Sequence, residues 1–339
     1  MKAPDSKTIL VTGGAGYIGS HTVHFLHEKG HKVIVLDNLC YGHPESLATI
    51  PVTLIHGDIG DRDLLTQIFS EHQIHSVIHF AAFAYVGESV TAPLKYYQNN
   101  LAAPLTLLAA MQAARCLRFV FSSTCATYGE PDQQPITEST PQLPINPYGK
   151  SKLMLETVLR DCDHAWGLKS VCLRYFNACG AHPDAIIGED HSPETPLIPL
   201  ILDVAAGTRQ SITIFGTDYP TPDGTCIRDY IHVLDLATAH LAAIEFLHTS
   251  TTSLACNLGT GHGVSVSQVI SAVEKITGRK IPTILGARRP GDPPALIADP
   301  SLALEKLHWK ALYLDIHQPI AHAWAWRSGP SNGSFPRHP

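Results

Sequence analysis

The chain has 339 residues, of which 44% are hydrophobic and 16% are charged, a composition typical of a folded protein with one large or two smaller domains. The net charge of −6 argues against sequence-independent binding of nucleic acid, which needs a basic surface. No apolar run approaches the ~20 residues that span a membrane and no signal-peptide core follows Met1, so we expect a cytoplasmic protein without a membrane partner.

The cysteines and histidines do not form a recognisable metal site. None of the eight cysteines has C-x-x-C spacing and several lie in apolar runs, which favours free thiols in a reducing cytosol. His21, His24 and His27 recur every third residue, but no carboxylate or cysteine completes a ligand set. We therefore predict an exposed helix face at these histidines and no metal.

The first half of the chain alternates strand-like and helix-like segments. Helical patterns run from about 17 to 29, from a cap at Asp61 to about 72, and from about 93 to 115. This alternation predicts an α/β fold with a Rossmann-like, doubly wound parallel sheet. The short apolar segments that predict its strands are 8–12, 32–37, 52–56, 76–80 and 118–122.

The composition of the sequence changes after Phe176. Residues 177–199 are rich in Gly, Pro and acidic side chains and predict a loop. Strands at 212–215 and 254–258 and helices at 233–247 and 265–277 are expected beyond it. We predict a first domain over 1–176, to which the chain returns around 230–250. We also predict a smaller mixed α/β domain over 177–327 and a disordered tail over 328–339.

A glycine triplet follows the first predicted strand directly. Gly13, Gly16 and Gly19 have G-x-x-G-x-x-G spacing and precede a helical pattern. Such a loop lets the backbone approach a pyrophosphate, which the free N–H groups of the helix N-terminus then bind. The pattern predicts a dinucleotide site, and a turn required only for packing is the alternative.

Two aspartates end the next strands. Asp37 can accept hydrogen bonds from ribose hydroxyls and would repel a 2′-phosphate, which favours NAD over NADP. Its alternative role is a turn or helix cap. Asp58 could meet the adenine edge, and a simple turn residue is as good an explanation.

A tyrosine and a lysine stand four residues apart in Pro147–Lys152. If this stretch opens a helix, Tyr148 and Lys152 lie on one face, where an ammonium would lower the tyrosine pKa from ~10. The pair is then a candidate general base at neutral pH. A surface helix turn would look the same in isolation.

These motifs together resemble those of a known family. The glycine loop, Phe121–Thr124 and Tyr148–Lys152 are similar to the extended short-chain dehydrogenase/reductase superfamily. From about residue 7 to 326 the chain resembles the UDP-glucose 4-epimerase family within it. The segments that carry this narrower resemblance are Arg174–Pro183, Ile214–Thr221, Arg228–Val233 and Arg289–Asp292.

The resemblance implies a reaction and its catalytic residues. Tyr148, its pKa lowered by Lys152 and by the nicotinamide charge, would take the proton from the sugar 4-hydroxyl, which Thr124 would hold. Hydride would pass to a tightly bound NAD, the 4-keto sugar would rotate, and hydride would return to its other face. Residues 1–176 would thus bind NAD and residues 177–327 the UDP-sugar. The family is commonly a homodimer, and the apolar stretch 101–114 could form that interface or be a core helix.

The resemblance also implies ligand contacts. Lys152 would bond the nicotinamide ribose, Arg228 and Arg289 the diphosphate, and Asp292 the uridine ribose. The other implied cofactor contacts are Tyr17, Ile18, Asn38, Ile59, Phe80, Ala81, Ala82, Asn99, Ser122 and Tyr175. Further implied substrate contacts are Asn177, Leu197, Thr213, Phe215, which would line the uracil pocket, and Tyr230.

Four positions depart from the family pattern. Ala84 replaces a lysine that touches the cofactor phosphates in some members, while Thr195 and Pro196 stand where many have a polar contact to the substrate. Leu296 stands where some bacterial members have tyrosine, which suggests room for the N-acetyl group of UDP-N-acetylhexosamines.

Other functions remain open on the sequence. A UDP-pentose or UDP-hexuronate 4-epimerase is an alternative. A sugar-nucleotide dehydratase is disfavoured, because Cys125-Ala126 follows Thr124 instead of an acid pair. A non-catalytic NAD-binding protein is disfavoured because Tyr148 and Lys152 are both present.

Overall fold

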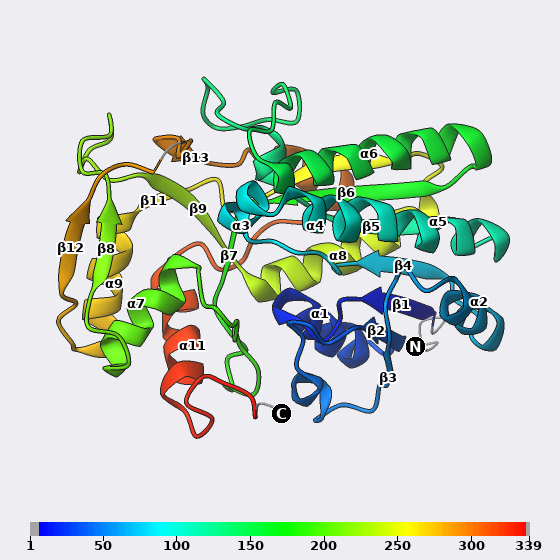
Figure 1. The fold of residues 1–339 in the computed structure, drawn as a ribbon, viewed down its shortest axis with the longest axis horizontal. Helices are drawn as coiled ribbons and strands as arrows, with labels where there is room; N and C mark the ends of the chain where they lie inside the picture. The colour runs from blue at the N-terminus through cyan, green and yellow to red at the C-terminus, as the bar shows by residue number, and fades with distance from the viewer. Residues whose placement is uncertain (1–6, 290, 337–339) are drawn as a thin grey trace.

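The structure is a computed structural model that describes residues 7–289 and 291–336. Its centre is a seven-stranded parallel sheet in the order β10-β6-β5-β4-β1-β2-β3 (Figure 1). This order confirms the predicted Rossmann-like α/β fold. The strands are β1 (Thr8–Thr12), β2 (Lys32–Asp37), β3 (Thr53–His56), β4 (Ser76–His79), β5 (Arg118–Thr124), β6 (Lys169–Tyr175) and β10 (Leu254–Leu258).

Helices cover both faces of this sheet because alternate strand residues point to opposite sides. Ile9 and Val11 of β1 join the core beneath α1 (Tyr17–Glu28), α8 (Val233–Thr249) and α10 (Ser301–Leu307). Leu10 joins the other core, beneath α2 (Arg62–Glu71), α5 (Ala103–Ala113) and α6 (Pro147–Trp166). Short helical segments fill the connections: η1 (Pro44–Leu47), α3 (Val86–Thr91), α4 (Pro93–Tyr97), η2 (Gln98–Ala102) and η3 (Cys125–Thr127).

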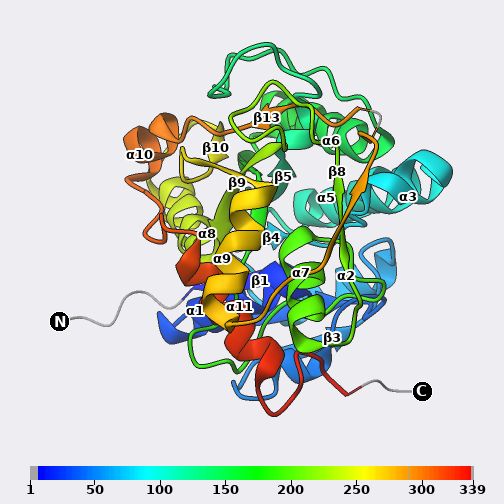
Figure 2. The ribbon, with the colours of Figure 1, turned by 90° about the vertical axis from the view of Figure 1, so that its left-hand side faces the viewer.

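A second, smaller layer packs beside the carboxyl ends of the large sheet (Figures 1 and 2). Its strands are β7 (Asn177–Cys179), β9 (Ile227–His232), β11 (Gly263–Ser265) and β13 (Ala295–Leu296), with a separate pair of β8 (Ile212–Phe215) and β12 (Thr283–Gly286). The helices α7 (Leu197–Ala206), α9 (Val266–Thr277) and α11 (His317–Ser328) supply its own apolar core.

Two secondary-structure predictions need correction. The strand at 254–258 forms as expected but belongs to the large sheet, because β10 pairs in parallel with β6. The helix predicted over 93–115 is interrupted by a π-helical turn at η2. Pro104 follows this turn, and its missing N–H leaves the normal bond to the carbonyl of Asn100 unmade.

Three further expectations are wrong in part. The loop predicted over 177–199 contains β7 and the start of α7. His21 is fully buried, since its ring packs edge-on against Tyr17 with the centroids 5.3 Å apart. Residues 329–336 are ordered: the backbone N–H of Phe335 donates to Asp190 at 2.8 Å and its ring packs on Trp326. Residues 337–339 of the predicted disordered tail lie outside the described residues.

The described part of the chain holds no helix that is both long and apolar enough to cross a membrane.

Burial of neutral histidines predicts a loss of stability in acid. Burial lowers the pKa of His240 to about 4, whereas in the unfolded chain it is about 6.5. Between these values the unfolded state binds more protons, so stability falls by up to about 3 kcal/mol as the pH drops from 6.5 to 4. His240→Phe should flatten this dependence in urea unfolding at pH 7 and 5. An unchanged slope would contradict the prediction.

Candidate active site

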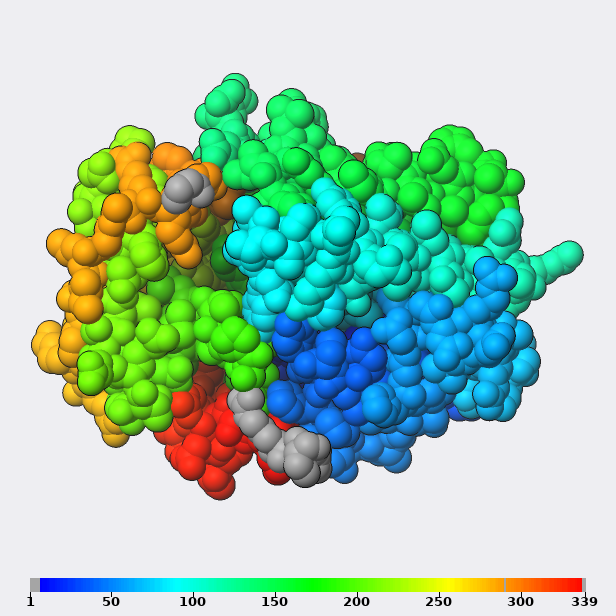
Figure 3. Space-filling view, viewed as in Figure 1, coloured from blue at the N-terminus to red at the C-terminus, as the bar shows by residue number. Residues whose placement is uncertain are grey.

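One large cavity runs along the carboxyl ends of the parallel strands and under the second layer. Its volume is about 990 Å³, and the surface is hollowed between the cyan segment around α3 and the orange chain around β13 (Figure 3). Every residue that the sequence predicts as catalytic, cofactor-binding or substrate-binding lines this cavity. Ligands of doubly wound sheets bind at this edge.

The glycine loop joins β1 to α1 at the centre of this edge, and its glycines serve different purposes. Gly13 has a φ of +71°, and a Cβ there would lie 2.5 Å from the backbone nitrogen of Ala81. A Cβ on Gly19 would overlap the carbonyl oxygen of Gly13. At Gly16 the φ is −78° and the nearest atom to a Cβ would be 3.5 Å away. Neither strain nor packing requires glycine at Gly16, so the loop fits the close approach of a dinucleotide phosphate.

The ends of β2 and β3 supply two carboxylates to the cavity. Asp37 accepts hydrogen bonds from the backbone N–H groups of Ala15 (2.9 Å) and Leu39 (2.8 Å), which fix its orientation. Burial raises the pKa of Asp37. Asp58 accepts from the side chain of Asn38 at 2.8 Å. Both carboxylates face the space beside the glycine loop, and their predicted contacts with the adenosine ribose and adenine stay predictions.

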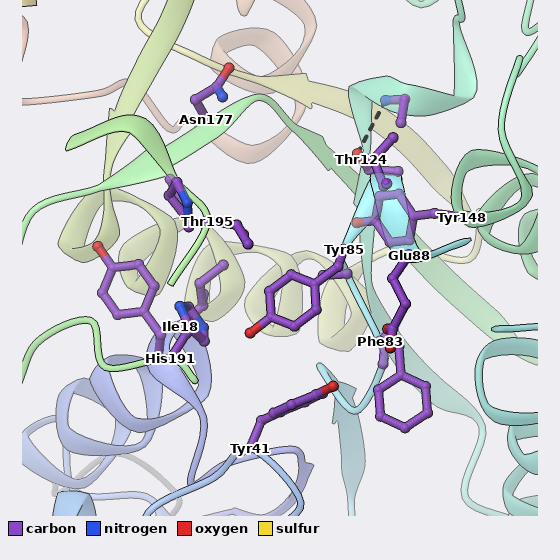
Figure 4. A pocket seen from close by; sticks show the side chains of 18 of the residues that line it. Ile18, Tyr41, Phe83, Tyr85, Glu88, Thr124, Tyr148, Asn177, His191 and Thr195 are labelled. Carbon is purple, nitrogen blue, oxygen red and sulfur yellow. Dashed lines mark hydrogen bonds between the residues drawn. The ribbon is translucent and has the colours of Figure 1, made fainter. Parts of the chain in front are cut away.

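The tyrosine and the lysine lie on the first turns of α6. Asn146 caps this helix by accepting from the N–H of Gly149 at 2.8 Å. Lys152 is 3% exposed, and its ammonium donates to the backbone carbonyl of Ser122 at 2.9 Å. It lies 5.9 Å from the centre of the Tyr148 ring. Thr124, at the end of β5, is beside Tyr148 (Figure 4).

The electrostatics of this pair differ from the expectation. Burial raises the pKa of Tyr148, and the hydrogen bond with Thr124 opposes this increase. Burial lowers the pKa of Lys152 to about 7. The predicted lowering of the Tyr148 pKa is therefore not found in the protein alone, because desolvation outweighs the contributions that favour the phenolate. The part of the lowering that was assigned to the nicotinamide charge stays a prediction.

Two arginines line the other end of the cavity, in the second layer. Arg228 of β9 and Arg289 both form ion pairs with Asp292, the latter at 3.0 Å. Arg289 also lies over the ring of Phe215, 5.1 Å from its centre. Asp229, the alternative partner of Arg228 by sequence, instead accepts from the backbone N–H of Thr260 at 2.9 Å.

The sequence prediction missed a group that closes the cavity. The hydroxyl of Tyr85 donates to the carbonyl of Pro193 at 3.1 Å, across the two layers. His191 lies between Glu189 (3.3 Å) and Glu194 (3.5 Å), and these carboxylates raise its pKa to about 10. The three side chains could also hold a metal ion, but an ion pair with a cationic histidine accounts for their arrangement. The only sequence signal was the acidic character of the loop.

Comparison with known proteins identifies the family. Residues 9–259 match the NAD dependent epimerase/dehydratase family. The chain belongs to this family. It is 53% identical to a UDP-glucose 4-epimerase of Halalkalibacterium halodurans over 96% of this chain and 97% of the relative.

Solved structures of UDP-glucose 4-epimerases share the whole architecture. The enzyme of Brucella ovis in complex with NAD is 48% identical, with a TM-score of 0.92 over 94% of this chain and 98% of that one. The enzyme of Bifidobacterium longum in complex with NAD+ and UDP is 43% identical, with a TM-score of 0.92 over 97% of this chain and 100% of that one.

The three glycines provide a matched pair of variants. Gly16→Ala adds a methyl group that the protein accommodates, so we expect an unchanged melting temperature and at least about tenfold weaker NAD binding. Gly19→Ala forces a backbone overlap and should destabilise the fold by about 1–3 kcal/mol. Thermal unfolding and the NAD content of the purified protein measure the two effects. Normal NAD binding by Gly16→Ala would contradict the assignment of this loop.

Proposed function

We propose that the protein is an NAD-dependent epimerase that interconverts UDP-glucose and UDP-galactose through transient oxidation at C4. The observation that carries this proposal is that one cavity joins the glycine loop, the Thr124–Tyr148–Lys152 group and the two arginines. We further propose that the large sheet with α8 and β10 binds NAD, and that the second layer binds the UDP-sugar. The family and the architecture shared with the enzymes above support this function.

The chemistry divides between the cofactor and the chain. Bound NAD⁺ supplies a hydride acceptor that is regenerated in each turnover, and a positive nicotinamide ring. In our proposal Tyr148 accepts the proton of the sugar 4-hydroxyl and later returns it, while Thr124 orients that hydroxyl. Because burial raises the pKa of Tyr148, the residue holds its proton until a positive charge favours the phenolate.

The second layer would hold the anionic part of the substrate. Asp292 fixes the guanidinium groups of Arg228 and Arg289 at the cavity wall. Their remaining N–H groups can donate to diphosphate oxygens, for which a planar guanidinium is well suited. The side chain of Phe215 offers an apolar surface for the uracil ring next to Arg289.

Tyr148→Phe tests the proposed reaction. We expect the rate of UDP-galactose conversion to fall by at least about 100-fold, because the proton acceptor is lost, while NAD stays bound. Tyr219→Phe is the control, since Tyr219 is a buried tyrosine that lies outside the cavity lining. A wild-type rate for Tyr148→Phe, or no conversion by the wild-type protein, would contradict the proposed function.

The position of Leu296 favours a second substrate class. Leu296 lines the cavity and is paired in register with Arg228, so it lies at the sugar-diphosphate end. We propose some activity on UDP-N-acetylhexosamines. Leu296→Tyr should reduce turnover of UDP-N-acetylglucosamine and spare UDP-galactose in a coupled assay. Undetectable turnover of the N-acetyl sugar by wild-type protein at high concentration would refute this extension.

We also propose that the protein works in the cytoplasm as a homodimer. Exposed apolar side chains gather on α3, α4, α5 and α6, with Leu94 81% and Val90 62% exposed. The predicted interface on α5 contributes Leu105, whereas Leu107, Leu108 and Met111 of the same helix are buried in the core. This face would be covered by the same face of a second copy.

Leu94→Glu places a charge in the proposed interface. We expect a shift from dimer to monomer in size-exclusion chromatography with light scattering, because a buried unpaired carboxylate is costly. Leu312→Glu, at a residue 67% exposed in the segment between α10 and α11, is the control and should leave the oligomeric state unchanged. A wild-type protein that is monomeric at micromolar concentration would refute the dimer.

A further inference from the structure

A buried ionic network lies behind the Thr124–Tyr148–Lys152 group. Glu156 of α6 is 1% exposed and Arg174 of β6 is 4% exposed. The carboxylate accepts two hydrogen bonds from the guanidinium, at 3.0 Å from Nε and 2.6 Å from Nη2. A bidentate pair of this kind has a fixed geometry and is strong when desolvated.

Neutral groups satisfy the remaining donors and acceptors of this pair. The hydroxyl of Ser123 donates to Glu156 at 2.6 Å, and Gln142 donates to it at 3.2 Å. Arg174 donates to the hydroxyl of Tyr128 at 2.9 Å, and Tyr128 in turn donates to Asn257 at 2.7 Å. The network therefore joins β5, β6, β10, α6 and the loop that leads into α6.

The network contacts the reaction site at two adjacent places. Ser122 and Thr124 of β5 line the cavity, and Ser123 between them points to the opposite face, towards Glu156. On α6, Glu156 comes one turn after Lys152, on the same side of the helix. The Glu156 carboxylate thus accepts a hydrogen bond from the residue beside Thr124, and Glu156 lies on the same helix as Tyr148 and Lys152.

We propose that Glu156 is a positioning residue for the reaction: its carboxylate holds Ser123 and so fixes the register of Thr124 against Tyr148, and it places a negative charge one helix turn from Lys152. This role rests on the proposed function, because it acts through the residues that handle the sugar proton. Glu156 does not line the cavity and touches no reacting atom.

The charges around Lys152 support this role. The groups that face it are His79 of β4, Tyr148 of its own helix and Tyr175 of β6, which is hydrogen-bonded to Ser122. Burial lowers the pKa of His79 to about 3 and raises those of Tyr148 and Tyr175, so all three are neutral between pH 5 and about 9. The Glu156 carboxylate raises the pKa of Lys152 and so partly offsets the lowering that burial causes. The same carboxylate forms an ion pair with Arg174 and neutralises its positive charge.

The test removes the carboxylate without leaving a buried arginine unpaired. In Glu156→Gln/Arg174→Gln both charges are lost, and two neutral amides replace them, the one at position 174 being shorter than the arginine. Activity that needs a cationic Lys152 is lost as the pH rises through the pKa of that lysine. Without Glu156 this pKa falls, so the alkaline limb of the kcat profile for UDP-galactose should move to lower pH by about one unit or more. NAD should stay bound and KM should change little.

Two further variants separate charge from position. Glu156→Asp keeps the negative charge, but the shorter side chain moves the carboxylate away from Ser123. We expect kcat to fall about tenfold or more, while the alkaline limb of the kcat profile stays at the wild-type pH. Gln142→Ala removes two neutral contacts, one to Glu156 and one from Arg174, but no charge and no contact with Ser123, so it should leave both quantities unchanged. A double variant or Glu156→Asp with the wild-type kcat and pH profile would overturn the positioning role. Absence of turnover by wild-type protein would instead overturn the proposed function.

Discussion

The burial of the Lys152 ammonium is the constraint on which the site depends. A charge on a residue that is only 3% exposed is costly, and burial lowers the pKa of Lys152 to about 7. The protein compensates with the carbonyl of Ser122 on one side and with the Glu156 carboxylate one turn away. Breaking such a buried network by removing one charge costs on the order of 3–5 kcal/mol. Both contacts require α6 to lie against β5 and β6, where Leu155 and Leu159 pack with Phe119 and Phe121.

Much of the fold was predictable because parallel strands leave a strong local pattern. Residues 8–12 form a buried strand with few alternatives, since β-branched and apolar residues occupy every position. A strand–glycine–helix order then fixes where the cofactor edge of the sheet must lie. All site residues expected from the sequence line the cavity. Gly13, Asp37 and Thr124 lie there because they end or follow strands whose carboxyl ends meet at that edge, whereas the two arginines reach it from the second layer.

Other features depend on contacts that no local pattern records. The assignment of β10 to the large sheet rests on pairing with β6, more than seventy residues earlier. His21 is buried by a packing partner on its own helix, and the segment 329–336 is held by Asp190. The pKa values of Tyr148 and Lys152 depend on desolvation, which residue spacing does not reveal. The closing group of Tyr85 and His191 likewise arises from contacts across the two layers.

The acceptor that holds Lys152 is a backbone carbonyl, and this has an evolutionary consequence. Any amino acid at position 122 presents the same carbonyl, so the contact survives every substitution that keeps β5 in place. Drift at this position in a lineage therefore carries no information about the lysine. Selection on the ammonium's environment acts instead on residues that preserve the path of the strand.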